Sequence, residues 1–425
     1  MIGAIADDFT GATDVAVAFR RAGMRTLVYF GIPGHAIDAP ADAVVIALKT
    51  RTVPVDDAVS ESTAAARWLQ ENGATQLYFK YCSTFDSRPE GNIGPVADAL
   101  ADLSGARVTP IVPSSPPHRR TQYMGNLFVG RQLLSQSPMR HHPLTPMRKS
   151  SVADLLAPQT ARPIALLDLE EVREGSAALR QRVEALPDRS YAVIDAIDDV
   201  DLLHVARAFI DEPLLTGAAG LAAALGAVAL ERRATAYSGL DSAPADIDPS
   251  LPGVALAGSC SARTLQQIAI MAERGHPALH VRAERDARPE DLAADALAWI
   301  DQQDLADGPL VYSSLPPAEL REVQERLGVA EASTLLETTM GLVARGLVER
   351  GVTRIVVAGG ETSGAVVQAL AVDGAEIGLE AAPGVPWIRT LGPRPLTLLL
   401  KSGNFGDENL LADAVGGERV GGLVA

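Results

Sequence analysis

The stretch that most constrains the fold covers residues 354–370, where a short apolar segment is followed by glycines and then by helix-forming residues. The Ile-Val-Val run at 355–357 is β-branched, which is typical of a strand buried in a parallel sheet. Thr362 or Ser363 can cap the helix that follows. This order of strand, tight turn and helix favours an α/β fold.

The glycines of this turn could bind an anion. Gly359, Gly360 and Gly364 have no side chains, so backbone N–H groups can converge on a phosphate at the positive end of the helix dipole. The segment fits neither GxGxxG nor GxxxxGK[ST]. Taken alone, it is equally compatible with a phosphate site and with a plain tight turn.

Composition limits the classes of protein. The 425 residues are 47% hydrophobic, which is enough for two or more compact domains. A net charge of −16 argues against nucleic acid or an anionic membrane as the main partner. No signal-like start or apolar run of membrane-spanning length occurs, so we predict a cytoplasmic protein. Cys82 and Cys260 lack CxxC spacing and suggest neither a disulfide framework nor a zinc site.

The order of strand, polar turn and helix recurs along the chain. We therefore predict two domains, each a mostly parallel sheet flanked by helices, with the active site in the cleft between them. The first domain covers 1–231, a linker low in periodic apolar residues covers 232–252, and the second domain covers 253–425. The proline-rich stretch 113–158 has little periodicity and is predicted to be a long loop or lid.

Three loops of the second domain follow predicted strands. In an open α/β sheet, ligands bind outside the carboxyl ends of the strands, so the loops at 258–261, 359–364 and 401–406 could line one nucleotide site. Helix caps alone would explain the serines and glycines, but they explain the Lys401-Ser-Gly-Asn cluster less well. The candidate nucleotide ligands are Ser259, Ser261, Gly359, Gly360, Glu361, Thr362, Ser363, Gly364, Lys401, Gly403 and Asn404.

Polar residues also follow two predicted strands of the first domain. Asp7, Asp8 and Asp14 lie in a polar turn that should lead into a helix starting at Val15. Three carboxylates so close together are costly unless they face water, a cation or a polyhydroxylated ligand, and capping accounts for one of them. Thr10 and Gly11 belong to the same turn.

The second polar loop begins at Lys80. Lys80 or Arg88 could pair with a substrate carboxylate, and Asp86 is a candidate general base. Such loops suit a sugar acid, although a hydrated surface loop is an alternative. His141 and His142 are adjacent, so their side chains diverge and make a poor metal pair. The candidate substrate ligands are Asp7, Asp8, Thr10, Gly11, Lys80, Ser83, Thr84, Asp86, Ser87, Arg88 and Asn92.

Several of these segments together resemble the four-carbon acid sugar kinases. The likeness covers nearly the whole chain. Residues 81–87 and 139–147 are most similar to the 3-oxo-tetronate kinases within that family, whereas 113–121 departs from the usual pattern before Arg-Thr. The segments that carry the resemblance are 5–14, 80–87 with Gly91-Asn92, 214–217, 258–261, 359–364 and 401–406.

The resemblance implies an acid-sugar domain followed by a nucleotide domain. It implies ATP contacts at Ser259, 359–362 and Gly403. Mg²⁺ would bridge the phosphates, and the sequence does not assign its protein ligands. The expected reaction is in-line transfer of the γ-phosphoryl group to the terminal hydroxyl of a 3-oxo-tetronate, giving the 4-phosphate. Asp8 or Asp86 would accept the hydroxyl proton.

Other functions are compatible with the same residues. A D-threonate or D-erythronate kinase of the same family is one alternative, and a nucleotide-regulated sugar-acid-binding protein without turnover is another. A nicotinamide dehydrogenase is disfavoured because no GxGxxG with a downstream acid occurs in the right context. A homodimer is compatible with the sequence, which leaves the oligomeric state and the substrate stereochemistry open.

Overall fold

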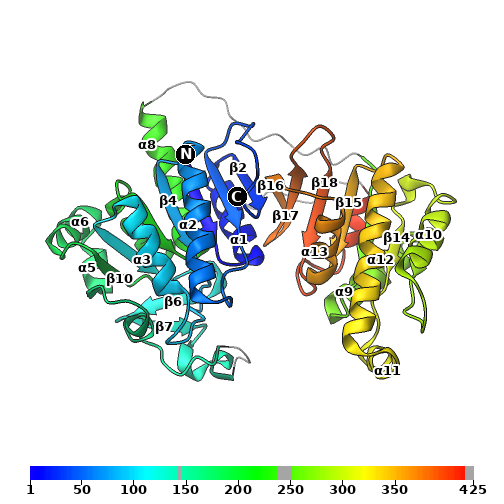
Figure 1. Ribbon diagram of the computed structural model, residues 1–425, viewed down its shortest axis with the longest axis horizontal. Coiled ribbons are helices and arrows are strands. Elements are labelled where there is room, and N and C mark those ends of the chain that lie inside the picture. Colours follow the sequence, from blue (N-terminus) through cyan, green and yellow to red (C-terminus); the bar gives the residue numbers. More distant parts are fainter. Residues whose placement is uncertain (142–144, 237–250, 417–425) are drawn as a thin grey trace. The chain divides into compact units, whose positions relative to one another are not determined.

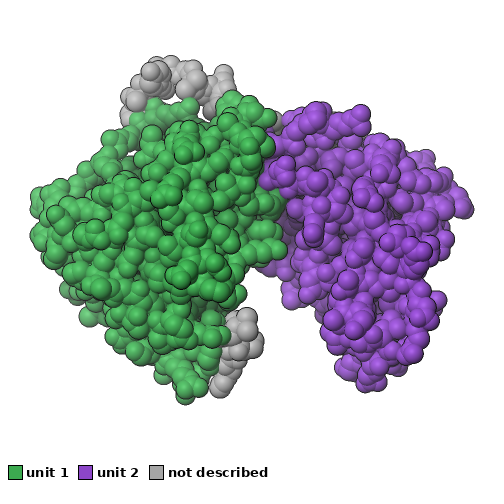
Figure 2. All heavy atoms as spheres, viewed as in Figure 1, with its two compact units in different colours: residues 1–244 green, residues 245–425 purple. Residues whose placement is uncertain are grey.

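The computed structural model describes residues 1–141, 145–236 and 251–416. The chain forms two compact units, Met1–Pro244 and Ala245–Ala425 (Figure 2). Each contains a largely parallel sheet flanked by helices (Figure 1), which confirms the predicted fold class. Within the predicted linker, residues 232–236 continue a helix, whereas residues 237–250 lie outside the described residues.

The first unit is built on a parallel sheet. Its strand order is β2-β3-β1-β4-β11-β5-β10-β9, and each neighbouring pair is parallel. The strands are β1 (Ile2–Ala6), β2 (Thr26–Phe30), β3 (Ala43–Ala47), β4 (Gln76–Lys80), β5 (Val108–Val112), β9 (Ile164–Leu167), β10 (Ser190–Ile194) and β11 (Leu214–Gly217). The helices are α1 (Phe9–Arg21), α2 (Val55–Glu71), α3 (Ile93–Ser104), α4 (Val152–Leu156), α5 (Leu169–Arg173), α6 (Ser176–Ala185), α7 (Asp199–Ala208) and α8 (Ala219–Ala236).

Two expectations for this unit are wrong. Helix α1 begins at Phe9 rather than at Val15, because Asp8 caps it, so Asp14 lies inside the helix. Part of the predicted loop 113–158 is a small antiparallel sheet of β6 (Arg120–Tyr123), β7 (Asn126–Val129) and β8 (Gln132–Leu133). The buried Asp195 holds its first turn by accepting the backbone N–H of Gly125 at 2.9 Å, a distant contact that local periodicity cannot reveal.

The second unit has the strand order β13-β14-β12-β15-β18-β17-β16. Its strands are parallel up to β18, whereas β17 is antiparallel to both of its neighbours. The strands are β12 (Val254–Ala257), β13 (Ala278–His280), β14 (Leu310–Tyr312), β15 (Arg354–Ala358), β16 (Gly374–Ala382), β17 (Val385–Thr390) and β18 (Thr397–Lys401). The helices are α9 (Ala262–Glu273), α10 (Pro289–Ile300), α11 (Pro317–Leu327), α12 (Val329–Glu349), α13 (Gly360–Ala369) and α14 (Leu410–Val415).

The register of the parallel strands brings their polar exits together. In the first unit Ala6 of β1 pairs with Ala47 of β3 and Lys80 of β4, so the three strands end side by side. In the second unit Ala358 of β15 pairs with Ala257 of β12 and Lys401 of β18. Each unit therefore gathers residues that are far apart in the sequence at one edge of its sheet.

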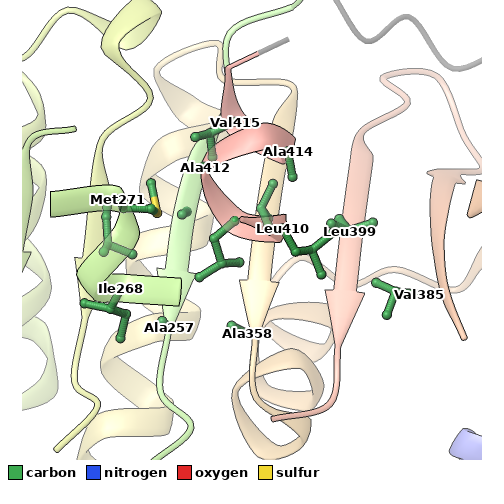
Figure 3. Packing of buried hydrophobic residues seen from close by; sticks show 14 of the residues in the cluster. Ala257, Ile268, Met271, Ala358, Val385, Leu399, Leu410, Ala412, Ala414 and Val415 are labelled. Carbon is green, nitrogen blue, oxygen red and sulfur yellow. The ribbon is translucent and has the colours of Figure 1, made fainter. Parts of the chain in front are cut away.

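Helices α9 and α14 cover one face of the second sheet (Figure 3). Ile268 and Met271 of α9 and Leu410 of α14 pack with Leu399 of β18 in one buried cluster. Burying side chains of this size stabilises the fold by about 1.5–3 kcal/mol each. The cluster anchors the strands whose exits form the predicted nucleotide site.

We expect Leu399→Ala to lower the free energy of unfolding of the second unit by about 2–5 kcal/mol, because it leaves a cavity in a closely packed cluster. Leu379→Ala is the matched control, since Leu379 is 61% exposed and its truncation should change stability by less than about 0.5 kcal/mol. Denaturant unfolding followed by tryptophan fluorescence measures both. Equal effects of the two substitutions would contradict the assigned core.

Candidate functional site

An ion-pair cluster lies at the exits of β1 and β3. Arg51 donates two hydrogen bonds to the carboxylate of Asp7, at 3.0 and 2.7 Å, and its terminal nitrogen lies 2.8 Å from Oδ1 of Asp8. Burial raises the pKa of Asp7, and the bonded guanidinium opposes that rise. Burial acts to lower the pKa of Arg51, but the bond to Asp7 outweighs it and holds the pKa above its usual range. Arg51 was not among the predicted site residues.

Asp8 has a second structural partner. Its Oδ1 accepts the backbone N–H of Gly11 at 2.7 Å, which is the N-cap bond of α1. The helix cap and the ion pairs to Arg51 thus account for two of the three clustered carboxylates. The third, Asp14, is half-buried inside α1.

The exit of β4 forms a compact turn. The buried Lys80 donates from Nζ to the carbonyl of Tyr81 at 2.9 Å. The backbone N–H of Asp86 donates to Sγ of Cys82 at 2.9 Å. Burial, reinforced by the nearby Asp86, raises the pKa of Cys82 to about 12, so this thiol is unreactive at neutral pH.

These exits surround a pocket of about 150 Å³. It brings together predicted residues from both polar loops of the first unit. It also includes Arg51, Ser115 and His118, which the sequence reasoning missed. For Arg51 a signal existed, since it follows a strand adjacent to β1. The lining residues are Asp8, Thr10, Gly11, Asp14, Arg51, Lys80, Cys82, Ser83, Ser115, His118, Ala218 and Ala219.

Other predicted substrate residues surround this pocket without lining it. The amide of Asn92 donates to the carbonyls of Thr50 at 2.7 Å and Val53 at 2.9 Å, so it holds the loop that carries Arg51. The hydroxyl of Ser87 accepts a hydrogen bond from Gln159 at 2.9 Å. Asn92 and Ser87 are thus positioned to shape the loops. The remaining predicted residues outside the lining are Asp7, Thr84, Asp86 and Arg88.

Two buried polar atoms in the segments beside this pocket have no hydrogen-bond partner. They are Nε of Arg120 and Oδ1 of Asp86. The backbone of Arg120 bonds to Ser115, and that of Asp86 bonds to Cys82, and both of these partners line the pocket. A buried polar atom without a hydrogen bond is costly, so a polar ligand that reached these two atoms would relieve that cost.

In the second unit, one carbonyl joins the exits of β12 and β18. The carbonyl of Gly403 accepts hydrogen bonds from the hydroxyls of Ser261, at 2.6 Å, and Thr264, at 2.9 Å. A Cβ at position 403 would lie 2.3 Å from Oγ of Ser259, so only glycine allows this approach. The loops at 258–261 and 401–406 therefore form one structure, as predicted from the sequence.

Lys401 lies beneath this structure and is only 1% exposed. Its ammonium donates to Thr264 Oγ1 at 3.1 Å, Gln267 Oε1 at 2.6 Å and the carbonyl of Gly403 at 3.1 Å. These three bonds use all of its N–H groups. The geometry therefore favours a positioning role for Lys401 over the direct nucleotide contact predicted from the sequence.

The glycine turn after β15 differs from the prediction in one respect. Helix α13 begins at Gly360, with Gly359 as its N-cap at a φ of +134°, so neither Thr362 nor Ser363 caps it. Among the described residues no side chain makes a capping hydrogen bond at the start of α13, which leaves its first N–H groups available to an anion. The Oγ of Ser363 is buried and has no partner. A Cβ on Gly360 or Gly364 would meet no atom within 4 Å, which marks open space in front of the turn.

No helix in the described ranges is both long and apolar enough to cross a membrane. His142 and the side chain of His141 lie outside the described residues. Glu361 and Asn404 are exposed in the segments that follow β15 and β18.

Comparison with known families identifies the two domains of the chain. Residues 2–225 match the family model of a sugar-binding N-terminal domain, and residues 254–411 match that of a nucleotide-binding C-terminal domain. Together the two matches cover most of the chain and both of the sites described above. The protein therefore combines a sugar-binding N-terminal domain with a nucleotide-binding C-terminal domain.

Individual relatives identify the family more closely. A 3-oxo-tetronate kinase of Pseudomonas fluorescens is 45% identical over 98% of this chain and 96% of its own length. A 3-oxo-tetronate kinase of Brucella melitensis is 43% identical over 97% of this chain and 94% of its own. A crystal structure of a Haemophilus influenzae protein is 39% identical, with a TM-score of 0.86 over 97% of this chain and 99% of the other. The chain belongs to the four-carbon acid sugar kinase family, as its sequence motifs predicted.

The buried Lys401 should make stability depend on pH. Burial, with the nearby Arg263, lowers its pKa from 10.5 to about 8. Between these values the unfolded chain binds more protons than the folded chain, so stability rises with pH across that window. We expect the unfolding free energy of the wild type to increase relative to Lys401→Met by on the order of 1–3 kcal/mol between pH 7 and pH 10.5. A difference that stays constant over this range in denaturant unfolding would contradict the assignment.

Proposed function

We propose that the protein transfers the γ-phosphoryl group of ATP to a four-carbon acid sugar, converting 3-oxo-tetronate into 3-oxo-tetronate 4-phosphate. The observation that carries this proposal is the near full-length similarity to proteins named 3-oxo-tetronate kinase, which spans both domains. The two sites described above supply the chemistry that such a kinase needs. The turn before α13 offers amides and hydroxyls, and the pocket of the first unit offers cations, hydroxyls and carboxylates.

The phosphates of ATP would bind at the start of α13. The uncapped amides there carry the positive end of the helix dipole, and the open space before Gly360 and Gly364 can admit a ligand. Ser259 and Gly403 lie against this turn, since Ser259 would contact a Cβ on either Gly359 or Gly403. The orphaned hydroxyl of Ser363 can donate to an oxygen of the nucleotide. Ser261 and Lys401 would act indirectly, because their hydrogen bonds to the carbonyl of Gly403 hold that residue in place.

The acid sugar would bind in the pocket of the first unit. Its volume of about 150 Å³ suits a small molecule, and Thr10 and Ser83 offer hydroxyl groups. Lys80 is the lining cation without an ion pair in the described ranges, whereas Arg51 is neutralised by Asp7 and Asp8. We therefore assign the substrate carboxylate to Lys80, with Arg88 as the alternative from sequence.

Magnesium is the metal that this chemistry implies. Within the described ranges no cluster of three or more His, Cys, Asp or Glu side chains could hold an ion. Mg²⁺ does not require such a cluster, because it is commonly bound by substrate phosphates, water and only one or two carboxylates. When bound, it would neutralise the phosphate charge that repels the incoming hydroxyl.

The protein's own residues would act mainly by positioning. Held in line with the γ-phosphorus, the terminal hydroxyl attacks as a carboxylate accepts its proton, and the bond to the β-phosphate oxygen breaks to release ADP. Asp8 and Asp86 are the bases predicted from the sequence. Arg51 would hold Asp7 and Asp8 in place, because it bonds to both.

A coupled ADP-release assay tests the function. We expect turnover with a 3-oxo-tetronate at a kcat/KM at least tenfold above the values for D-threonate and D-erythronate. Higher turnover with either of those acids would identify the protein as a different kinase of the same family. A ligand-induced thermal shift without ADP release would instead identify a binding protein.

Gly360→Ala tests the nucleotide site. The new methyl enters open space, so the fold should be unchanged or slightly more stable, since Ala favours a helix over Gly by about 1 kcal/mol. In the ligand complex the same methyl would meet a phosphate, and we expect ADP affinity in calorimetry to fall at least tenfold. Gly34→Ala is the control, because a Cβ there also meets no atom within 4 Å but lies in the first unit. Unchanged ADP binding by Gly360→Ala would argue against phosphates at this turn.

A further inference from the structure

We propose that Asp14 is the general base that accepts the proton of the acceptor hydroxyl, an assignment that rests on the kinase function proposed above. The sequence predicted Asp8 or Asp86 for this role and placed Asp14 in a turn before the helix. The structure instead carries Asp14 on α1, where it lines the pocket beside Thr10 and Gly11.

The partners of each nearby carboxylate distinguish these residues. Asp7 is bound by Arg51, and Asp8 both caps α1 and pairs with Arg51. Asp14 also lines the pocket, but no residue in the described ranges bonds to or forms an ion pair with its carboxylate. Its oxygens are therefore available to a ligand hydroxyl.

Asp86 is the weaker candidate on position. Its buried Oδ1 lacks a partner, but Asp86 does not line the pocket. A general base must come within hydrogen-bond reach of the proton that it removes, and so a lining residue meets this condition more directly.

The surroundings of Asp14 also suit a base. Burial is the largest influence and raises its pKa, and Asp8 adds to this rise; Lys80, His118 and Arg51 oppose it. A carboxylate with a raised pKa is a stronger proton acceptor than an ordinary one. Lys80 lines the same pocket and can hold the substrate carboxylate while Asp14 faces a hydroxyl.

The chemical step balances without a further reactant. The hydroxyl oxygen of the acid sugar forms a bond to the γ-phosphorus as the bond between that phosphorus and the bridging oxygen breaks. The electron pair leaves with ADP. The hydroxyl proton passes to an oxygen of Asp14 and is then released to water.

Asp14→Asn is the direct test, because it keeps the shape of the side chain and removes the base. We expect kcat with 3-oxo-tetronate to fall at least 100-fold, while the KM for ATP changes less than about threefold. The wild-type kcat/KM should decline as the pH falls through the pKa of Asp14, and that decline should be absent from the residual activity of the variant. Asp14→Glu retains a carboxylate and should keep the decline at a reduced rate.

Stability gives a readout that separates catalysis from structure. Because burial raises the pKa of Asp14 in the folded protein, the folded chain binds more protons than the unfolded chain between pH 3.8 and the raised value, and the carboxylate disfavours folding above it. Asp14→Asn should thus unfold at an equal or higher temperature than the wild type at pH 7. A loss of activity caused by misfolding would come with a lower unfolding temperature. In that case the pH dependence of the activity of Asp14→Glu would decide the test.

Two further variants isolate the group that titrates. Histidine can also ionise in this range, so His118→Asn should retain the acidic decline if Asp14 causes it. Asp8→Asn should retain it as well. The proposal is overturned if Asp14→Asn keeps more than a third of the wild-type kcat, or if the decline survives in Asp14→Asn and disappears in Asp8→Asn or Asp86→Asn. If the wild type releases no ADP with any four-carbon acid, the proposed function fails instead.

Discussion

The parallel register of the strands is the constraint on which both sites depend. Because Ala6 pairs with Ala47 and with Lys80, the residues after β1, β3 and β4 meet at one edge of the first sheet. The same arrangement joins the exits of β12, β15 and β18 in the second. Parallel strands need helical crossovers, so the polar residues of each site come from distant segments and rest on buried apolar strands. The chemistry of each site follows from this geometry.

Both sites use hydrogen-bonded cations for positioning. Arg51 bonds to Asp7 and Asp8, and Lys401 bonds to Thr264, Gln267 and Gly403. In each case the cation is hydrogen-bonded to acceptors of the protein, so it fixes the shape of the candidate site instead of presenting a free charge. The cost of burying these groups fits a site that must stay rigid, because phosphoryl transfer depends on alignment more than on covalent help from the protein. Lys80 and Asp14 are left to face the substrate in this scheme.

Much of the fold was predictable because its pattern is local. Short β-branched strands alternate with amphipathic helices, and that order predicted the α/β class and two domains. Where distant contacts decide, the sequence was insufficient: Asp195 holds the turn between β6 and β7, and the β16–β17 hairpin was not predicted. The start of α1 was also misplaced, because the polar side chains of its first turns resemble a loop when their cap at Asp8 is not recognised.

The sequence by itself determined the family, the reaction class and the loops that carry the candidate residues, because motifs and strand exits are local features. Tertiary structure decided which of those side chains are free to act. Asn92 and Lys401 were predicted as ligand contacts, yet their donors are taken up by carbonyls and side chains up to 137 positions away. Arg51 and Asp14 gained importance for the opposite reason. Folding brought Arg51 to two carboxylates and left Asp14 in a pocket with no bonding partner among the described residues. The partners of a polar group are set by packing between distant segments, which local sequence does not encode.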